Sequence, residues 1–154
     1  MSRVIGKNIE VYVFLILALL AVYWNVWDFD FIRYDDPQYV FENPVAQGGL
    51  TWRGIIWSLT DISTGYWHPL TWISLMADYE LYELNPGGYH LTNLLLHIIN
   101  SILLFIILNS LTGVFWCSTF VAALFALHPL HVESVAWVAE RKDVLSGLFW
   151  MLTL

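Results

Sequence analysis

Four long apolar stretches alternate with more polar segments along the chain of 154 residues. The first covers residues 11–27, and at about 1.5 Å per helical residue it nearly crosses a hydrocarbon core of about 30 Å. The others cover residues 91–111, 114–127 and 144–154. This pattern predicts an all-α membrane protein, a polytopic helical bundle of about four spans. The fourth stretch is still apolar where the sequence stops, so we expect a truncated last span and a longer parent protein.

The first apolar stretch fits an uncleaved signal anchor better than a cleaved signal peptide. Arg3 and Lys7 supply the basic flank that both kinds of segment need. However, Tyr23, Trp24 and Trp27 stand where a signal peptide would have small residues for cleavage. Aromatic side chains of this kind are typical of the membrane interface, so we expect the helix to remain in the mature protein.

The basic flank also predicts the orientation of the chain. By the positive-inside rule the N-terminus is cytoplasmic, and residues 28–90 then form an outer loop in the periplasm, the extracellular space or the lumen of the endoplasmic reticulum. Residues 128–143 form a second loop on the same side, because two further spans return the chain there. Arg141 and Lys142 oppose this assignment, but acidic residues flank both of them.

The second apolar stretch is uncharged but has one polar face. Five polar residues recur at spacings of about three to four, which places them on one side of a helix. Such a face packs on other helices or lines a cavity. The only ionisable member, His97, is interpreted as a helix-packing residue. The five residues are Thr92, Asn93, His97, Asn100 and Ser101.

Two further helices are predicted within the first outer loop. A helix over residues 50–59 gathers apolar side chains on one side, and Thr51 is a candidate for its N-cap. A helix over residues 69–84 begins with proline in its first turn and carries three acids, which makes it a poor span. We expect both helices to lie in the membrane interface. The apolar side of the first consists of Trp52, Ile55, Ile56 and Leu59.

Composition supports a membrane environment and argues against nucleic acid as a partner. Hydrophobic residues make up 58% of the chain and charged residues 12%, against about 25% charged residues in soluble domains. The net charge is −7, and all acidic residues except Glu10 fall in the two outer loops. The negative charge therefore describes an external face. The single cysteine, Cys117, lies in a predicted span and cannot form an internal disulfide.

The first candidate for chemistry is the adjacent pair Asp35 and Asp36, directly behind the first span. Carboxylates are costly near a bilayer, and two neighbouring ones repel each other, so their presence indicates a site. A carboxylate at the membrane surface could take a proton from an attacking hydroxyl. The alternative is that Asp-Asp-Pro forms an ordinary solvated turn.

The second outer loop combines histidine, acidic and basic side chains. His128, His131 and Glu133 could bind a divalent ion, but they lack the His-Glu-x-x-His spacing, so a metal is not required. Arg141 and Lys142 could instead neutralise a phosphate. The alternative is a solvated loop with internal ion pairs. His68 and His90 each border an apolar helix on the outer side, where a single histidine is more often structural than catalytic.

The order of these features resembles the N-terminal part of the GT-C class of membrane glycosyltransferases. It is most similar to the transmembrane and tetratricopeptide-repeat O-mannosyltransferases and their bacterial relatives. The Gly-Tyr-His-Leu-Thr-Asn and His-Pro-Leu-His-Val-Glu stretches are specific, whereas an Asp pair alone is not. The resemblance extends from about residue 11 onward. Its motifs are Tyr34-Asp35-Asp36, Asn43, His68-Pro69-Leu70, residues 88–97, residues 128–136 and residues 141–146.

The resemblance implies transfer of a sugar, with mannose as the candidate, from a polyprenyl-phosphate donor to a protein or glycan acceptor at the outer face of the bilayer. In the family pattern the acidic motif of the first outer loop takes the proton, and that role falls on Asp35 and Asp36. A divalent ion is compatible with this chemistry. The candidate substrate-binding residues are His68, His90, His131, Glu133, Arg141, Lys142 and Asp143.

A different class of protein stays open at this point. The chain could belong to a non-enzymatic polytopic membrane protein, such as a transporter, or a scaffold that carries tetratricopeptide repeats. Transporters place ionisable residues inside their spans, near the midplane of the bilayer. Here His97 is the only such residue, which favours the glycosyltransferase.

Overall fold

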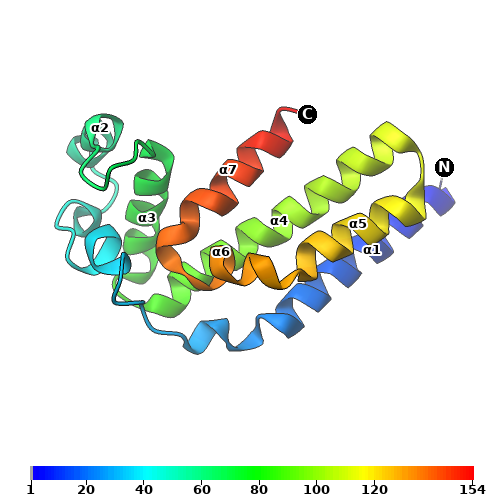
Figure 1. The fold of residues 1–154 in the computed structure, drawn as a ribbon, viewed down its shortest axis with the longest axis horizontal. Helices are drawn as coiled ribbons and strands as arrows, with labels where there is room; N and C mark the ends of the chain where they lie inside the picture. Colours follow the sequence, from blue (N-terminus) through cyan, green and yellow to red (C-terminus); the bar gives the residue numbers. More distant parts are fainter. Residues whose placement is uncertain (1) are drawn as a thin grey trace.

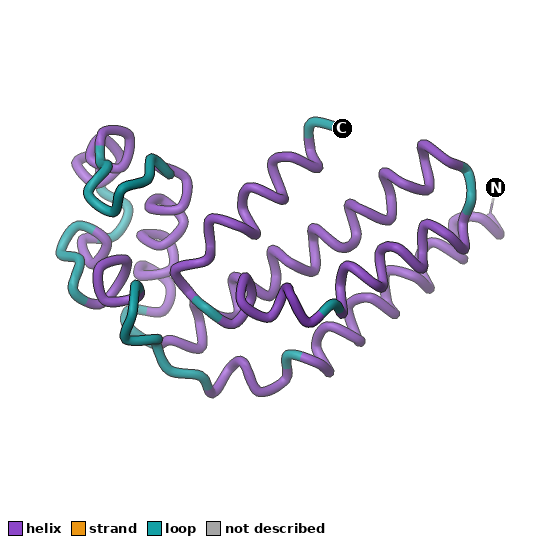
Figure 2. The backbone as a smooth tube through the Cα atoms, viewed as in Figure 1, coloured by secondary structure: helices purple, strands orange, loops and turns teal. Residues whose placement is uncertain are grey.

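A computed structural model describes residues 2–154 of the chain, with side chains from Lys7 onward. Throughout this part the chain forms helices joined by loops and turns (Figure 2). The α-helices are α1 (Ser2–Val22), α2 (Trp52–Thr60), α3 (Pro69–Tyr82), α4 (Pro86–Thr112), α5 (Phe115–Leu127), α6 (Val132–Ala136) and α7 (Arg141–Leu152). The short helices are η1 (Trp24–Asp28), η2 (Pro37–Phe41), η3 (Ala46–Gly48), η4 (Pro129–His131) and η5 (Val138–Glu140).

The prediction of an all-helical protein is confirmed, but the four-span bundle is not. Within residues 2–154, α4 is the one helix that is long and apolar enough to cross a membrane by length and composition. A second candidate arises if α5 and the bent segment Pro129–Ala136, at 48° to it, count as one span. The predicted first span is divided, because α1 ends at Val22 and η1 follows.

The long helices form one end of the molecule and the first outer loop forms the other (Figure 1). Helix α4 runs antiparallel to α1 and α5 and contacts both. Leu15 and Leu19 of α1, Phe105 of α4 and Ala122 of α5 are buried in the apolar core between them. A second core, centred on Trp72 of α3, joins the loop segments to η5.

The polar face of α4 packs on other helices, which was one of the two predicted alternatives. Asn93 Nδ2 donates to the Trp137 carbonyl (3.0 Å), His97 Nε2 to the Ala126 carbonyl (3.0 Å) and Asn100 Nδ2 to the Val144 carbonyl (2.8 Å). The Ala126 carbonyl lies in the last turn of α5, where no following helical turn can satisfy it, and the Trp137 carbonyl also accepts from the Glu140 N–H (3.2 Å). The polar face of α4 therefore attaches the non-continuous helical segment between α5 and α7 to α4.

Two glycines at the start of α4 fix its neighbours. Asn85 caps the helix by accepting a hydrogen bond from the Gly87 N–H (3.2 Å). A Cβ on Gly87 would lie 2.6 Å from the Trp27 carbonyl oxygen, and one on Gly88 would lie 2.2 Å from the Tyr82 ring. Only glycine allows both approaches, so η1 and the end of α3 pack directly on the first turn of α4.

The two predicted loop helices exist, but one is buried more deeply than expected. Thr51 caps α2 as predicted, because its Oγ1 accepts a hydrogen bond from the Gly54 N–H (3.1 Å). Helix α2 buries Gly54 and Ser58 and leaves much of its apolar side exposed. Helix α3 packs between α2, α4 and α7 and buries Trp72 and Asp78, and its place in the membrane interface stays a prediction.

Candidate functional site

The two outer loops meet at Asp36. Its carboxylate accepts hydrogen bonds from the backbone N–H groups of Ile32 (2.8 Å) and Ala139 (2.9 Å). The residue is completely buried. Burial raises the pKa of Asp36 above its ordinary value, although both N–H groups act in the opposite direction. Asp36 therefore joins the first outer loop to η5 and presents no free carboxylate.

Its neighbour Asp35 has a different environment. The Asp35 side chain is partly exposed, and Gln38 Nε2 donates to one of its oxygens at 3.3 Å. The Asp35 carbonyl accepts from the Tyr39 N–H at 3.2 Å, which fixes the backbone at the start of η2. Of the two predicted catalytic residues, Asp35 is the one whose carboxylate can reach a substrate.

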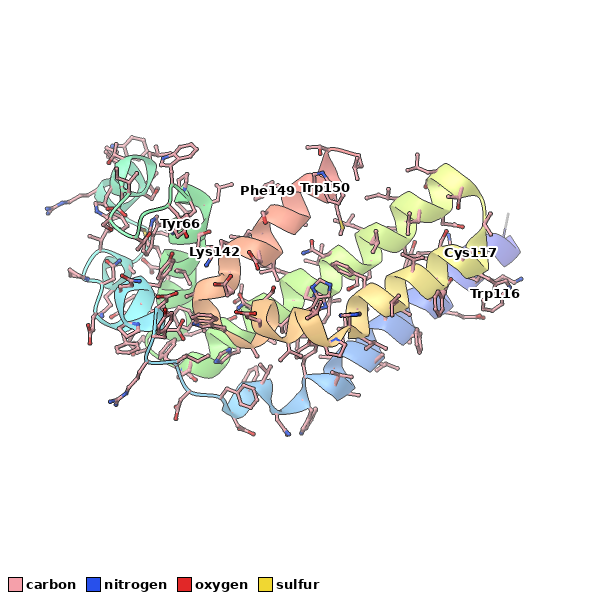
Figure 3. The ribbon with its side chains drawn as sticks, in the orientation of Figure 1. Tyr66, Trp116, Cys117, Lys142, Phe149 and Trp150 are labelled. Carbon is pink, nitrogen blue, oxygen red and sulfur yellow. The ribbon has the colours of Figure 1, made fainter. Side chains whose placement is uncertain are left out.

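A cavity of about 570 Å³ lies between the start of α3 and α7, and we call it the Lys142 cavity. Polar side chains of His68, Lys142, Asp143 and Ser146 line it, together with apolar ones such as Phe149. Figure 3 shows Lys142 on the first turn of α7, on the side toward α3. An amphiphile would find here a cation, a carboxylate and an apolar wall.

Lys142 remains a cation in this environment. Its Nζ donates to Glu140 Oε1 (2.7 Å) and lies 6.0 Å from the centre of the Tyr39 ring. Burial lowers the pKa of Lys142, but the hydrogen bond and charge of Glu140 more than offset this, and the net shift is upward. The side chain is 29% exposed, so it can meet a ligand in the cavity.

His68 stands beside Lys142 in a stack of three rings. Its ring centre lies 5.5 Å from that of Tyr39 and 5.2 Å from that of Trp72. Neither ring nitrogen has a hydrogen-bond partner within residues 2–154. Burial, and then the charge of Lys142, lower the pKa of His68, so the ring is neutral at pH 7. Both nitrogens are buried, so His68 contributes ring surface to the cavity rather than an accessible hydrogen-bond donor.

Arg141 takes a place that the sequence did not predict. Its guanidinium is completely buried and donates to Asp78 (2.5 Å), Ser74 (2.6 Å) and the Tyr89 carbonyl (2.9 Å), and its Nε–H donates to Asn93. Arg141 therefore does not face Asp35 and Asp36 across a cleft. Arg141 joins α3, α4 and α7, and the structure gives no support to direct phosphate binding by it.

The remaining predicted residues are not brought into the Lys142 cavity. His90 is fully buried in α4, with its ring 6.1 Å from that of Phe29. His131 lies beside the bend after α5, 5.4 Å from His97 between ring centres. Glu133 is exposed. Within residues 2–154, no group of three or more His, Cys, Asp or Glu side chains lies close enough together to hold a metal ion.

Sequence reasoning missed three residues that shape the site. Tyr39 and Glu140 position His68 and Lys142, and Asp78 neutralises Arg141. A signal for Tyr39 was its place directly after the Asp-Asp-Pro turn. For Asp78 the signal was a carboxylate on an otherwise apolar helix, which must find a partner when it is buried.

These features define an all-helical protein with one helix long enough to cross a membrane and a polar site where two loops meet. Comparison with known proteins identifies the family. Residues of this chain are 33% identical to Protein O-mannosyl-transferase Tmtc2 of Drosophila melanogaster over 141 residues, which is 86% of this chain and 15% of that protein. The human TMTC2 is 35% identical over 144 residues (88% of this chain, 17% of that protein).

Human TMTC4 is 30% identical over 148 residues, which is 82% of this chain and 20% of that protein. The chain is therefore a homologue of one segment of the TMTC protein O-mannosyl-transferases, and the resemblance found in its motifs is confirmed. It spans between about a seventh and a fifth of the length of these relatives. No family model and no solved structure matches the chain.

Proposed function

We propose that this chain forms part of a membrane glycosyltransferase that moves mannose from a polyprenyl-phosphate donor to a hydroxyl group of a protein acceptor. The names of the relatives, protein O-mannosyl-transferases, support the reaction type. The observation that carries the proposal is that two adjacent carboxylates have different environments. Asp36 is buried as the anchor of the loop, which holds Asp35 partly exposed at the start of η2.

In the proposed reaction, the acceptor oxygen attacks the anomeric carbon of the sugar. The bond from that carbon to the phosphate oxygen breaks, and the leaving polyprenyl phosphate takes the electron pair. Asp35 accepts the proton of the acceptor hydroxyl as general base. The charge of Lys142 stabilises the negative charge of the phosphate, and the His68 ring forms the adjacent wall of the cavity. The isoprenoid chain lies along apolar residues of the Lys142 cavity, such as Phe149.

The proposal keeps the predicted membrane arrangement, with four spans, a cytoplasmic N-terminus and the site at the outer face. A contact between the loops supports a common side for both, because Asp36 bonds to Ala139. The rival class of transporters gains no support, since Asn93, His97 and Asn100 of α4 are occupied by carbonyl groups of neighbouring segments.

The decisive experiment replaces Asp35 with asparagine in the full chain and measures transfer of labelled mannose from polyprenyl-phosphate mannose to an acceptor peptide. Loss of a general base lowers the rate by about a hundredfold or more. Thermal stability should stay unchanged, because Asp35 makes only one long hydrogen bond to a side chain. Glu42→Gln is the matched control, since Glu42 is an exposed acid of the same loop. Wild-type transfer by Asp35→Asn refutes the assignment.

The donor half of the proposal has its own test. Lys142→Gln should raise the apparent KM for the polyprenyl-phosphate donor while leaving the KM for the acceptor peptide unchanged. An unchanged donor KM would remove the Lys142 cavity from the reaction and leave the role of Asp35 standing.

A further inference from the structure

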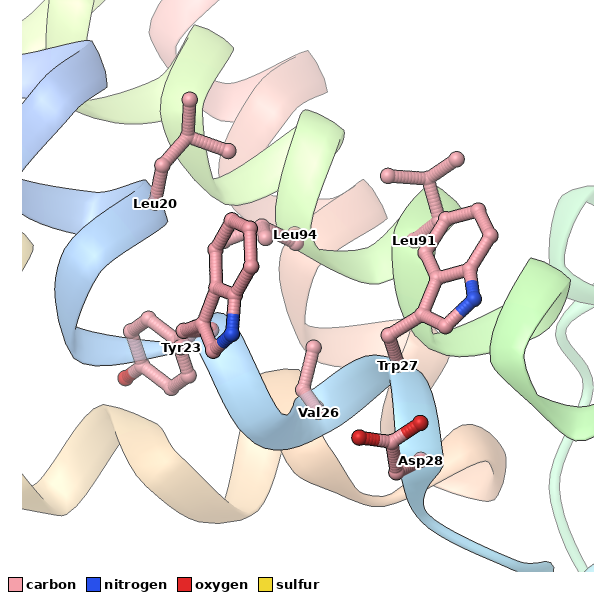
Figure 4. Close-up of a pocket in the computed structure, with 8 residues that line it drawn as sticks. Leu20, Tyr23, Val26, Trp27, Asp28, Leu91 and Leu94 are labelled. Carbon is pink, nitrogen blue, oxygen red and sulfur yellow. The ribbon is translucent and has the colours of Figure 1, made fainter.

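A second cavity, of about 460 Å³, lies between η1 and α4, and we call it the Asp28 cavity (Figure 4). Its most prominent walls are the indole rings of Trp24 and Trp27. These residues are three apart in a 3₁₀-helix, whose residues i and i+3 lie on the same side. Figure 4 shows the Trp27 ring rising from η1 toward α4, beside Leu91. The cavity is thus a slot with an aromatic wall from η1 and an aliphatic wall from α4.

The indoles are accessible from outside. Trp24 is 78% exposed and Trp27 is 55% exposed, although both line the cavity. Helix η1 directly follows the apolar helix α1 and precedes the acidic loop. Tryptophan is characteristic of the level where lipid head groups meet the acyl chains. The cavity therefore opens at the depth of the chain where a phospholipid has its head group.

The charge of the cavity decides what it can bind. Asp28 is the only charged side chain that lines it, and no cation does. Within residues 2–154 the Asp28 carboxylate takes part in no side-chain hydrogen bond or ion pair. A bound anion would therefore meet repulsion and no compensating donor charge. A cation would be attracted both by the carboxylate and by the negative faces of the two indoles.

The apolar lining restricts further which ligands fit the Asp28 cavity. Leu20 of α1 and Leu91 and Leu94 of α4 continue the slot with aliphatic surface. A free sugar or a small hydrophilic amine would leave this aliphatic surface without a partner. A lipid with a positively charged head group satisfies both parts of the lining.

We propose that the Asp28 cavity binds a zwitterionic phospholipid, with the positively charged head amine between Asp28 and the indole rings and an acyl chain along Leu20 and Leu94. The lipid phosphate stays outside the cavity, in contact with water. This site is distinct from the Lys142 cavity, whose lining includes a cation as well as a carboxylate. It does not depend on the proposed glycosyl transfer.

The test is a lipid titration of the purified full chain in detergent, with bound lipid counted by native mass spectrometry. The probes are phosphatidylcholine, phosphatidylethanolamine and, as the anionic comparison, phosphatidylglycerol. We expect saturable binding of the zwitterionic lipids with at least severalfold preference over phosphatidylglycerol. Tighter binding of the choline lipid would mean that the indole faces contribute most of the binding energy of the head amine. Tighter binding of the ethanolamine lipid would mean that Asp28 contributes most of it. Either order supports the site.

Variants identify the cavity as the place of binding. Asp28→Asn should weaken binding about fivefold, the effect of one unit charge at about 4 Å in water. Trp24→Leu and Trp27→Leu should each weaken it about two- to fivefold through loss of a cation–π contact. Asp28→Glu should restore most of the affinity, which separates charge from misfolding. The controls are Asp30→Asn, Trp116→Leu and Lys142→Gln, none of which changes the lining of this cavity.

Three outcomes overturn the proposal. The first is equal binding of phosphatidylglycerol and phosphatidylcholine, and the second is unchanged binding in the Asp28 and tryptophan variants. The third is absence of lipid from the wild-type chain, which would mean that another part of the protein covers the slot.

Discussion

The Lys142 cavity and the Asp28 cavity are similar in volume but differ in charge and in the way their walls are held. The first, of about 570 Å³, is lined by a cation that Glu140 keeps protonated although burial acts in the opposite direction. The second, of about 460 Å³, is lined by a carboxylate without a partner in the described part of the chain. The difference teaches that two cavities of similar size in one helical chain favour different ligands, because only the first has a cation in its lining.

The walls of the two cavities are fixed by different kinds of contact. Helices α3 and α7, which border the Lys142 cavity, are joined by the buried pair of Arg141 and Asp78. Helix η1, which borders the Asp28 cavity, is held to α4 by a close backbone approach between Trp27 and Gly87. A buried ion pair fails severely when one partner is removed, whereas a packing contact yields gradually. The two cavities should therefore respond very differently to substitution.

The largest effect is expected from Arg141→Ala. This change leaves the carboxylate of Asp78 buried without its cation and removes the bonds to Ser74 and Asn93. Breaking a buried pair in this way costs about 3–5 kcal/mol of unfolding free energy. Denaturant unfolding of the chain in mixed micelles measures it. Lys142→Ala, one residue along, should cost no more than about 1 kcal/mol, because its pair with Glu140 is partly exposed.

Equal losses in the two variants would contradict the comparison, since they would place Arg141 and Lys142 in similar environments. If Arg141→Ala lowers stability as expected, lipid binding at the Asp28 cavity should still be detectable at low temperature, because η1 is attached to α4 independently of α7.

The second effect is expected from Asp36→Asn, which separates the roles of the adjacent carboxylates. An amide can accept at its oxygen, but its NH₂ group would face one of the two N–H donors of Ile32 and Ala139. The lost bond at a buried site costs about 2 kcal/mol of unfolding free energy. Asp35→Asn should leave the stability nearly unchanged. Thermal unfolding followed by circular dichroism distinguishes the two, and equal melting temperatures would refute the anchor role.

Local patterns predicted much of the fold. The apolar periodicity and cap residues gave α2 with Thr51 at its start, and the polar spacing in α4 predicted a face for other helices. These signals lie within one helix, where sequence spacing translates directly into geometry. The division of the first apolar stretch at Val22 was missed, because apolar composition alone does not distinguish an α-helix from a following 3₁₀-helix.

The candidate site was predicted only in its residue types. Arg141 and Asp78 are 63 residues apart, and no local pattern indicates that they pair. Likewise Asp35 and Asp36 are equivalent in the sequence, and only the contact of Asp36 with η5 makes one an anchor and the other accessible. Trp24 and Trp27 were interpreted as part of an aromatic belt, and their common cavity with Asp28 became visible only with the packing of η1 on α4.

The smallest effect on stability, and the most selective one, is expected from Gly87→Ala. The new methyl group would lie 2.6 Å from the Trp27 carbonyl oxygen, so η1 must move away from α4. The strain of such a contact is about 1–3 kcal/mol, but alanine in place of helical glycine recovers part of it, and the net loss should be about 1 kcal/mol. Because η1 carries both indoles, Gly87→Ala should also weaken the binding of zwitterionic lipid. The loss of binding free energy should be several times larger than the loss of unfolding free energy. Donor binding at the Lys142 cavity should not change, since Gly87 lies outside its walls.

The same titration on Gly48→Ala, at a glycine with open space around it, is the control. If Gly87→Ala weakens binding at both cavities equally, the walls of the two sites are coupled through α4 and are not held independently.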